Sequence, residues 1–293
     1  MVKLSVGLPV RNGERFLAET LDCLLSQTFQ DFELIISDNG STDRTIEICQ
    51  SYDDPRIQIE RQDTNQGAAW NFNRVFELSK GEFFKWAAHD DLISPDYLER
   101  CMSALHHEPE SVLCYTGVQV IDEAGDLLEE TSVTTNAFAL QAHKRFREMV
   151  LKQHPCNHIF GVFRSEALRK SRMMGKYMAS DRVLLAQLTT FGKFHEIPLP
   201  LFFWRRHPWQ SIRFMKTPQA YTRWFDPQAE GQFYFPNWRI LREYHKVIAE
   251  SDMGWVDRLK CSLWLWVWPL RYAPWLGLDI LRFLRNMVRK DLR

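Results

Sequence analysis

The sequence lacks an excess of charge of either sign. Its 293 residues include 37 Lys and Arg against 37 Asp and Glu. A protein whose main partner is a nucleic acid usually shows a basic surplus, so this balance argues against nucleic acid as a partner. Apolar residues make up 45% of the chain, which is enough for a sizeable core and argues against disorder over most of its length.

Cysteine pairs, zinc-ligand spacings and a leader segment are missing too. The six cysteines stand apart from one another, mostly within apolar segments, and none form a C-x-x-C pair. We therefore expect reduced core thiols in a cytoplasmic protein. The histidines follow no zinc-ligand pattern. The N-terminal residues run directly into a strand-like segment, without the charged start and apolar stretch of a signal peptide, so secretion is not expected.

Strand-like and helix-like segments alternate along the N-terminal part of the chain. The predicted strands are short apolar runs at 4–10, 32–37, 57–62 and 82–87. The predicted helices are the segments at 14–27, 42–51, 67–78 and 95–107. This order is typical of βαβ units, and it predicts an α/β fold whose mostly parallel, Rossmann-like sheet has helices on both faces.

The following segment predicts a change in the sheet. Residues 112–130 contain two strand-like runs around a turn at 122–126, so we expect the sheet to become mixed there. The remaining predicted elements are a helix at 139–152, a strand at 158–164, a helix at 181–191 and a strand at 193–197. We expect one α/β domain at 1–210, with halves at about 1–110 and 111–210, and a connecting segment at 211–251.

The C-terminal segment 252–293 is rich in tryptophan and basic residues, and it predicts a helical extension. Pro269, Arg271, Pro274 and Asp279 interrupt any stretch long enough to span a membrane. Indole rings prefer the headgroup layer and arginine prefers anionic lipid, so the composition favours a helix pair lying on a membrane surface. The alternative is a helical subdomain or dimer contact packed on the domain at 1–210.

Polar clusters follow three of the predicted strands, at 9–14, 38–43 and 89–91. In open α/β sheets, ligands bind beyond the carboxyl ends of the strands, so these clusters predict the binding edge. A hard divalent cation needs only one or two protein carboxylates when water and phosphates complete its shell, which Asp90 and Asp91 can provide. The alternative is that both acids only favour the start of the next helix.

The cluster at 38–43 is similarly open to two interpretations. Gly40 permits a sharp turn, and Asp38 and Asn39 can present hydrogen-bonding groups to a nucleobase or ribose. The alternative is an ordinary capped loop between a strand and a helix.

Taken together, these segments resemble the family 2 glycosyltransferases, which are inverting enzymes with the GT-A fold, over roughly residues 3–210. The matching segments are SVGLPVRN at 5–12, LSQT at 25–28, FELIISDNGSTD at 32–43, NxG at 65–67, KGE at 80–82 and HDD at 89–91. Their order and spacing make the match specific, whereas any one of them alone would be weak.

The resemblance implies a donor site at the binding edge. The residues it implies for the nucleotide-sugar pocket are Pro9, Val10, Arg11, Glu14, Asp38, Asn39, Asn65, Asn73 and Asp90. It implies that Asp91 is the ligand of a divalent metal, Mn²⁺ or Mg²⁺. The chain departs from the family pattern at Asn39, where Asp is frequent, at Phe72, and at His89, which replaces the first acid of the metal turn.

The resemblance also implies the groups that carry the transfer. It places the catalytic base at Asp181, at the start of a helix after the strand at 158–164. From the residues alone, the alternative is that Asp181 is only a first-turn acid or N-cap of an apolar helix. Arg206 and His207 would neutralise the leaving nucleoside diphosphate, and the alternative is an exposed basic turn.

The implied function is transfer of a sugar from a nucleoside-diphosphate sugar, with UDP-sugars favoured, to a hydroxyl of a lipid-linked or surface-glycan precursor in bacteria. The implied location is the cytoplasm, with peripheral binding to the inner face of the membrane. A nucleotidyltransferase is an alternative, but it would be expected to carry a glycine-rich basic loop after the first strand, which 9–14 lacks. A non-catalytic sugar-binding protein is a further alternative, against which the presence of both Asp91 and Asp181 argues.

Overall fold

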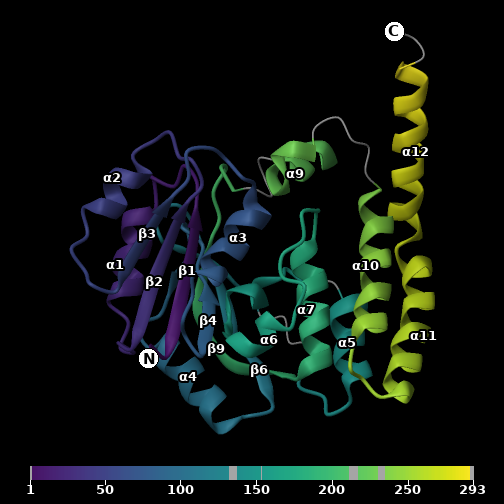
Figure 1. Cartoon of the computed structure of the whole chain (residues 1–293), viewed down its shortest axis with the longest axis horizontal. Coiled ribbons are helices and arrows are strands. Elements are labelled where there is room, and N and C mark those ends of the chain that lie inside the picture. The colour runs from purple at the N-terminus through teal and green to yellow at the C-terminus, as the bar shows by residue number, and fades with distance from the viewer. Residues whose placement is uncertain (1, 132–136, 153, 211–216, 230–234, 291–293) are drawn as a thin grey trace.

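A computed structural model describes residues 2–131, 137–152, 154–210, 217–229 and 235–290. The strands are β1 (Leu4–Val10), β2 (Phe32–Asp38), β3 (Ile57–Arg61), β4 (Phe83–Trp86), β5 (Leu92–Ile93), β6 (Ser111–Ile121), β7 (Leu127–Thr131), β8 (Val162–Arg164) and β9 (Lys193–Arg205). They form one sheet in the order β3-β2-β1-β4-β8-β6-β9-β5, with β7 paired to β6 (Figure 1).

The sheet is parallel in its N-terminal part and mixed beyond it, as the sequence predicts. Strand β1 lies between β2 and β4, and β2 pairs with β3, all parallel. Strand β8 is antiparallel to both β4 and β6, whereas β6 and β9 run parallel. Because β1, β2 and β4 are parallel neighbours, their carboxyl ends bring the three polar clusters to one edge.

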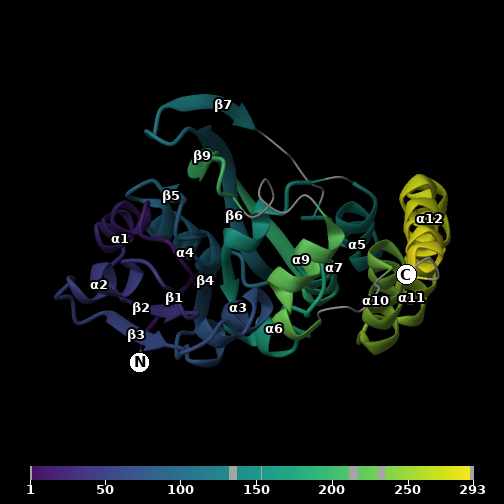
Figure 2. The same cartoon turned by 90° about the horizontal axis from the view of Figure 1, so that it is seen from above.

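Helices cover both faces of the sheet (Figures 1 and 2). Those of the sheet domain are α1 (Leu17–Leu25), α2 (Thr45–Gln50), α3 (Ala68–Glu77), α4 (Tyr97–His107), α5 (Ala142–Leu151), α6 (Ser165–Arg169) and α7 (Ser180–Phe191). In β2, Leu34 and Ile36 pack in the core beneath α1 and α4, and Ile35 packs in the core with α3. Side chains alternate between faces along a strand, so a strand buried on both faces is apolar throughout.

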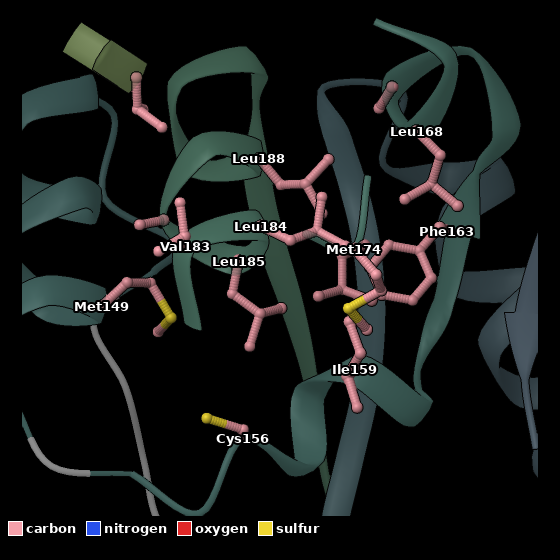
Figure 3. Close-up of a cluster of buried hydrophobic side chains, with 14 of the residues drawn as sticks. Met149, Cys156, Ile159, Phe163, Leu168, Met174, Val183, Leu184, Leu185 and Leu188 are labelled. Atoms are coloured by element: carbon pink, nitrogen blue, oxygen red, sulfur yellow. The ribbon is translucent and has the colours of Figure 1, made fainter. Parts of the chain in front are cut away.

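Two predicted strands differ from the structure. Residues Asn157–Phe160 form a 3₁₀ turn, and only the three residues of β8 pair, because Cys156 takes a left-handed conformation with φ 62° that turns the chain. The predicted strand at 193–197 continues through residues 199–203 as the single strand β9. Its pairing with β6 shifts register near Gly117. Figure 3 shows α7 packed by Leu184 and Leu188 against Phe163 of β8.

The C-terminal helices are α9 (Pro218–Phe225), the 3₁₀ turn Pro227–Ala229, α10 (Pro236–Glu250), α11 (Trp255–Arg271) and α12 (Ala273–Lys290). Among them, α10, α11 and α12 form a layer beside the sheet domain, whereas α9 lies by α3 (Figures 1 and 2). Buried Cys261, Leu265 and Trp268 attach α11 to the core, and Tyr244 of α10 lies in the same cluster. No helix of the described chain is both long and apolar enough to cross a membrane. Residues 211–216 of the predicted connecting segment, and Arg293, lie outside the described residues.

Candidate functional site

The loop after β1 is fastened to the loop after β2 by side chains that bond to backbone groups. The Asn12 N–H donates to Ser41 Oγ at 2.8 Å, and Asn12 Oδ1 accepts from the Thr42 N–H at 2.9 Å. The Glu14 carboxylate accepts from the Arg44 N–H at 3.0 Å. Asn12 therefore crosses between loops, with φ 54°, instead of capping the helix that follows it. The two loops form one rigid wall.

This wall places the first group of predicted donor residues. Pro9 and Val10 are buried at the end of β1, while Arg11 projects into solvent at the same edge. Asp38 is fully buried, and its carboxylate accepts from the Ser41 N–H at 3.2 Å. The side chains of Pro9, Val10 and Asp38 are thus buried beneath the loops, and Asp38 holds the second loop by its bond to Ser41. The Arg11 guanidinium, by contrast, is exposed to a ligand.

Asn39 organises the next loop from a buried position. It is only 2% exposed. Its Oδ1 accepts from the Gln66 N–H at 2.8 Å, and its Nδ2 donates to Asn65 Oδ1 at 3.1 Å and to the Gly67 carbonyl at 3.2 Å. All these contacts lie within the protein, so in this structure Asn39 shapes the loop at 65–67.

Asn73 joins the two halves of the sheet domain. Its Nδ2 donates to the Met174 carbonyl and its Oδ1 accepts from the Met174 N–H, both at 3.0 Å. These two bonds attach α3 to the loop that leads into α7. The predicted base, Asp181, lies in the first turn of α7, so Asn73 links the donor side to the helix that carries it.

Helix α9 lies over the same region. The Phe225 carbonyl approaches Gly67 so closely that an added Cβ would meet it at 2.5 Å, and Gly67 has φ 92°. Tyr221 of α9 lies near enough to Asp181 to feel its charge. Burial, together with the negative charge of Asp181, raises the pKa of Tyr221 to about 12. The Asn65–Gly67 loop, α9 and the start of α7 therefore meet in one place.

The His89-Asp90-Asp91 turn is held by the far end of β9. Asp91 Oδ1 accepts from the Arg205 N–H at 2.9 Å, and Arg205 Nε donates to the Asp90 carbonyl at 3.0 Å. Asp90 Oδ2 meets His207 Nε2 at 2.9 Å. The structure thus brings His207, one of the two residues expected to face the leaving diphosphate, to the acidic turn. It brings Arg206 to Glu129 of β7 instead, in an ion pair beside the Trp204 ring.

Electrostatics separate the two acids of this turn. Burial and the neighbouring Asp90 raise the pKa of Asp91 well above its usual value. Burial acts to raise the pKa of Asp90 too, but the positive charge of His89 and the hydrogen bond from His207 outweigh it, and the pKa is lowered. Burial therefore opposes the charge on Asp91 more than that on Asp90, and a nearby cation would relieve this cost at Asp91.

Arg205 and Lys85 are site residues that sequence reasoning missed. Arg205 is fully buried and donates from Nη2 to Glu19 at 2.6 Å and from Nη1 to the Glu123 carbonyl at 2.9 Å. Lys85 is buried in β4, 4.8 Å from the Tyr97 ring, and desolvation lowers its pKa to about 8. The basic segment at 205–207 indicates that an arginine contributes to the site. The sequence does not show that Arg205 holds the turn at 89–91 while Arg206 pairs with Glu129 of β7.

Asp181 occupies an environment suited to proton transfer. It follows Ala179, which has φ 62°, and its Oδ1 accepts from the Arg182 N–H at 2.9 Å. Burial raises the pKa of Asp181. The hydrogen bond from the Arg182 N–H, the charge of Arg182 and a hydrogen bond from Cys156 lower the pKa, but they offset only part of the effect of burial. A carboxylate with a raised pKa is a better proton acceptor at neutral pH.

A match to a known protein family shows which family this chain belongs to. The model of glycosyl transferase family 2 matches residues 5–171. The chain belongs to this family. A family 2 relative, an uncharacterized glycosyltransferase of Rickettsia typhi, is 33% identical over 121 residues, which cover 41% of this chain and 37% of that protein. The matched region therefore spans well under half of that relative.

Solved structures show the fold of this family 2 chain. TarS residues 1–349 of S. aureus match with a TM-score of 0.67 at 16% identity, over 92% of this chain and 71% of that one. A mannosyltransferase of Pyrobaculum calidifontis, in complex with GDP-Man and Mn²⁺, matches with a TM-score of 0.54 at 14% identity, over 97% and 87%. These likenesses establish the GT-A fold that the sequence predicts.

Proposed function

We propose that this protein is an inverting glycosyltransferase that moves a sugar from a nucleoside-diphosphate sugar, with UDP-sugars favoured, to an acceptor hydroxyl. The observation that carries the proposal is the presence of two acids with raised pKa on different elements, the buried Asp91 and the half-buried Asp181. Asp91 is fixed at the edge of the sheet by Arg205, and Asp181 lies at the start of α7 with a raised pKa. TarS has also been crystallised with UDP, which supports the favoured donor.

The donor would bind along the wall formed by the first two loops. Arg11 and Glu14 offer charged groups at the edge, and Asp38 and Asn39 keep the surrounding loops in place. Asn65 would border the nucleotide pocket through the loop that Asn39 shapes. Asn73 would act indirectly, by joining α3 to the segment before α7.

Asp91 would hold a divalent metal, Mn²⁺ or Mg²⁺. No group of three or more His, Cys, Asp or Glu that could enclose a metal occurs among the described residues. A metal bound mainly by diphosphate and water needs no such group, and a carboxylate is the ligand type it prefers, so the residues present fit it. When bound, the metal would neutralise charge on the departing diphosphate.

Asp181 would remove the proton from the acceptor hydroxyl. The hydroxyl oxygen then forms a bond to the anomeric carbon as the bond from that carbon to the diphosphate oxygen breaks, which inverts the configuration. The buried His207, oriented by Asp90, would donate to the leaving phosphate side, with Arg206 nearby on the same strand end. The base and the metal ligand serve opposite sides of the sugar.

Release of nucleoside diphosphate tests this proposal. We expect the protein to release UDP from a UDP-sugar in the presence of Mn²⁺, slowly with water and faster with an acceptor, and EDTA should stop the release. Coupled detection of UDP, repeated with GDP-sugars, measures it. If no UDP- or GDP-sugar yields metal-dependent release, the proposed activity is wrong.

The acceptor is proposed to be lipid-linked, because the C-terminal helices present an apolar surface to solvent. We define the outer face by its exposed apolar residues on α11 and α12, which are Trp255, Val256, Leu259, Leu263, Trp266, Val267, Leu270, Trp275, Leu278, Ile280, Leu281 and Leu284. Trp255 and Trp266 are each 76% exposed. The acids of these helices are engaged elsewhere: Asp257 pairs with His143, and Asp279 is buried against Asn237.

The outer face is thus apolar with a basic fringe, which suits peripheral binding to an anionic membrane. We expect Leu263→Ser/Leu270→Ser to weaken binding to liposomes containing phosphatidylglycerol by about thirtyfold, since each exposed leucine that enters lipid contributes on the order of 1 kcal/mol. Liposome flotation measures the effect. The matched control is Leu127→Ser/Leu128→Ser, a similarly exposed pair on β7. Equal binding by both variants, or no binding by the unmodified chain, would contradict the membrane proposal.

A further inference from the structure

A cleft of about 540 Å³ opens beside the start of α7. Its lining residues are His154, Pro155, Arg182, Asn237, Tyr272 and Trp275. They come from the segment after α5, from α7, from α10 and from the corner between α11 and α12, which lie along one side of the sheet domain (Figures 1 and 2). Arg182 directly follows Asp181 in the sequence, so the cleft adjoins the proposed base. The C-terminal helices therefore form part of the wall of this cleft.

Arg182 brings a cation to this cleft, where, among the described residues, its guanidinium bonds to backbone carbonyls rather than forming an ion pair. Its Nη1 donates to the His154 carbonyl and its Nη2 to the Lys152 carbonyl, both at 3.3 Å. Across the described chain, no carboxylate forms an ion pair with its guanidinium. The Asp181 carboxylate accepts from the Arg182 backbone N–H instead. A guanidinium has five N–H donors in a planar fork, so N–H groups beyond those bound to the two carbonyls and to Tyr244 remain for an anion such as phosphate.

His154 adds an unused hydrogen-bond acceptor at the same place. It is 5% exposed, and its Nε2 lies 3.2 Å from the Met149 carbonyl. Burial, with the charge of Arg182, lowers its pKa to about 4, so the ring is neutral near pH 7. Because a carbonyl can only accept, Nε2 carries the proton and Nδ1 has a lone pair. Within the described part of the chain, that buried Nδ1 has no partner. A ligand hydroxyl would satisfy it.

Aromatic side chains form the opposite wall. Tyr272 stacks on Trp268 with ring centres 4.5 Å apart, which fixes its position. Trp275 is 51% exposed at the rim. Trp275 belongs to the outer face, as do the exposed Leu270 and Leu278 near it in the sequence. The cleft therefore joins a cationic, hydrogen-bonding interior to an apolar exit.

We infer that this cleft binds the phosphate group of an amphipathic acceptor, with the phosphate on Arg182, a hydroxyl on His154 and the lipid chain leaving past Trp275 onto the outer face. The inference rests on the proposed function and names its acceptor class. It also gives the C-terminal helices a direct part in substrate binding. Asp279, which holds Asn237 by hydrogen bonds of 2.9 to 3.2 Å, is a positioning residue for this wall.

Binding of farnesyl diphosphate to the full chain, measured by calorimetry with the donor site saturated by UDP and Mn²⁺, tests this inference. We expect one farnesyl diphosphate per chain, weaker binding of inorganic pyrophosphate, and no comparable binding of farnesol. Arg182→Gln should weaken binding of both anions at least tenfold. The matched control is Arg285→Gln, an exposed arginine of α12 outside the cleft, which should change binding less than twofold.

A second variant covers the case in which Arg182→Gln does not fold. Trp275→Ala alters an exposed side chain, and it should weaken binding of farnesyl diphosphate at least threefold while leaving pyrophosphate unchanged. Farnesol binding as tightly as farnesyl diphosphate, or farnesyl diphosphate binding that neither substitution alters, would overturn the inference. The affinity for UDP with Mn²⁺, measured in the same variants, reports the donor site separately, so a failure of the proposed function is distinguishable.

Discussion

Asp181→Asn is expected to lower the rate of sugar transfer by about 10²- to 10⁴-fold while leaving the affinity for UDP unchanged within about twofold, because positioned general bases contribute that much to rate. An amide keeps the size of the carboxylate and can still accept the Arg182 N–H, but it cannot take a proton from the acceptor. Steady-state rates with donor and acceptor, together with UDP titration, separate the two effects.

The matched control is Glu166→Gln. Glu166 is also an acid in the first turn of a helix, α6, but it is exposed and paired with Lys170. If both substitutions reduce transfer equally, or if Asp181→Asn retains more than about a tenth of the rate, Asp181 is only a helix-start acid.

Stability gives an independent reading of the same substitution. Burial raises the pKa of Asp181 in the folded chain. The folded state therefore holds this proton more tightly than the unfolded chain, and the stability that this group contributes is present below its unfolded pKa and is lost as pH rises through its folded pKa. At neutral pH the ionised carboxylate thus costs stability. Asp181→Asn should keep or raise the melting temperature, whereas an N-cap role predicts a fall.

The pH dependence of transfer follows from the same shift. Since the base must be ionised, the rate should fall on the acid side, around a pKa above the usual aspartate value. A rate that stays constant down to the ordinary pKa range of an exposed aspartate would contradict this assignment.

The sequence predicts the N-terminal half of the sheet well because its signals are local. Leu34, Ile35 and Ile36 are apolar in succession, which is typical of a strand buried on both faces, and the structure places them in two cores. Turn residues such as Gly40, with φ 70°, mark the ends of the strands. Parallel neighbours then bring the polar loops to one edge without further information.

The residues that hold the site together depend on contacts distant in sequence, and local patterns do not predict those. Arg205 contacts Asp91 across 114 positions, and Asn73 contacts Met174 across 101. Asn12, which follows β1, bonds to Ser41 and Thr42 of a loop that lies about 30 positions further along the chain. The amide of Asn39 reads as a ligand contact from its place after a strand, yet its burial directs it to the loop at 65–67.

The sequence of the C-terminal helices also does not predict which of their side chains are buried. Tryptophan and arginine content predicts an interfacial segment, but composition does not say which face is free. In the structure Cys261, Leu265 and Trp268 are buried in the core, while Trp255 and Trp266 face solvent. The packed subdomain and the exposed apolar face that sequence analysis treats as alternatives are thus two sides of the same helices.

Asp91→Asn is expected to remove the dependence of donor binding and transfer on divalent metal, and to lower transfer by about 10²- to 10³-fold. A metal that stabilises a departing diphosphate contributes several kcal/mol, and each 1.36 kcal/mol is a factor of ten in rate. The amide oxygen can still accept the Arg205 N–H, so the end of β9 should keep its place and the fold should be retained. Calorimetric titration of UDP with Mn²⁺ and with EDTA measures the change.

The informative comparison is with Asp90→Asn. That substitution weakens the contact with His207 but leaves the Asp91 carboxylate available, so UDP binding should still respond to EDTA. The two adjacent acids therefore separate the metal ligand from the residue that orients His207. If EDTA weakens UDP binding in Asp91→Asn as strongly as in the unmodified chain, the metal is held elsewhere, and the buried Asp91 serves only to fix Arg205 at the end of β9.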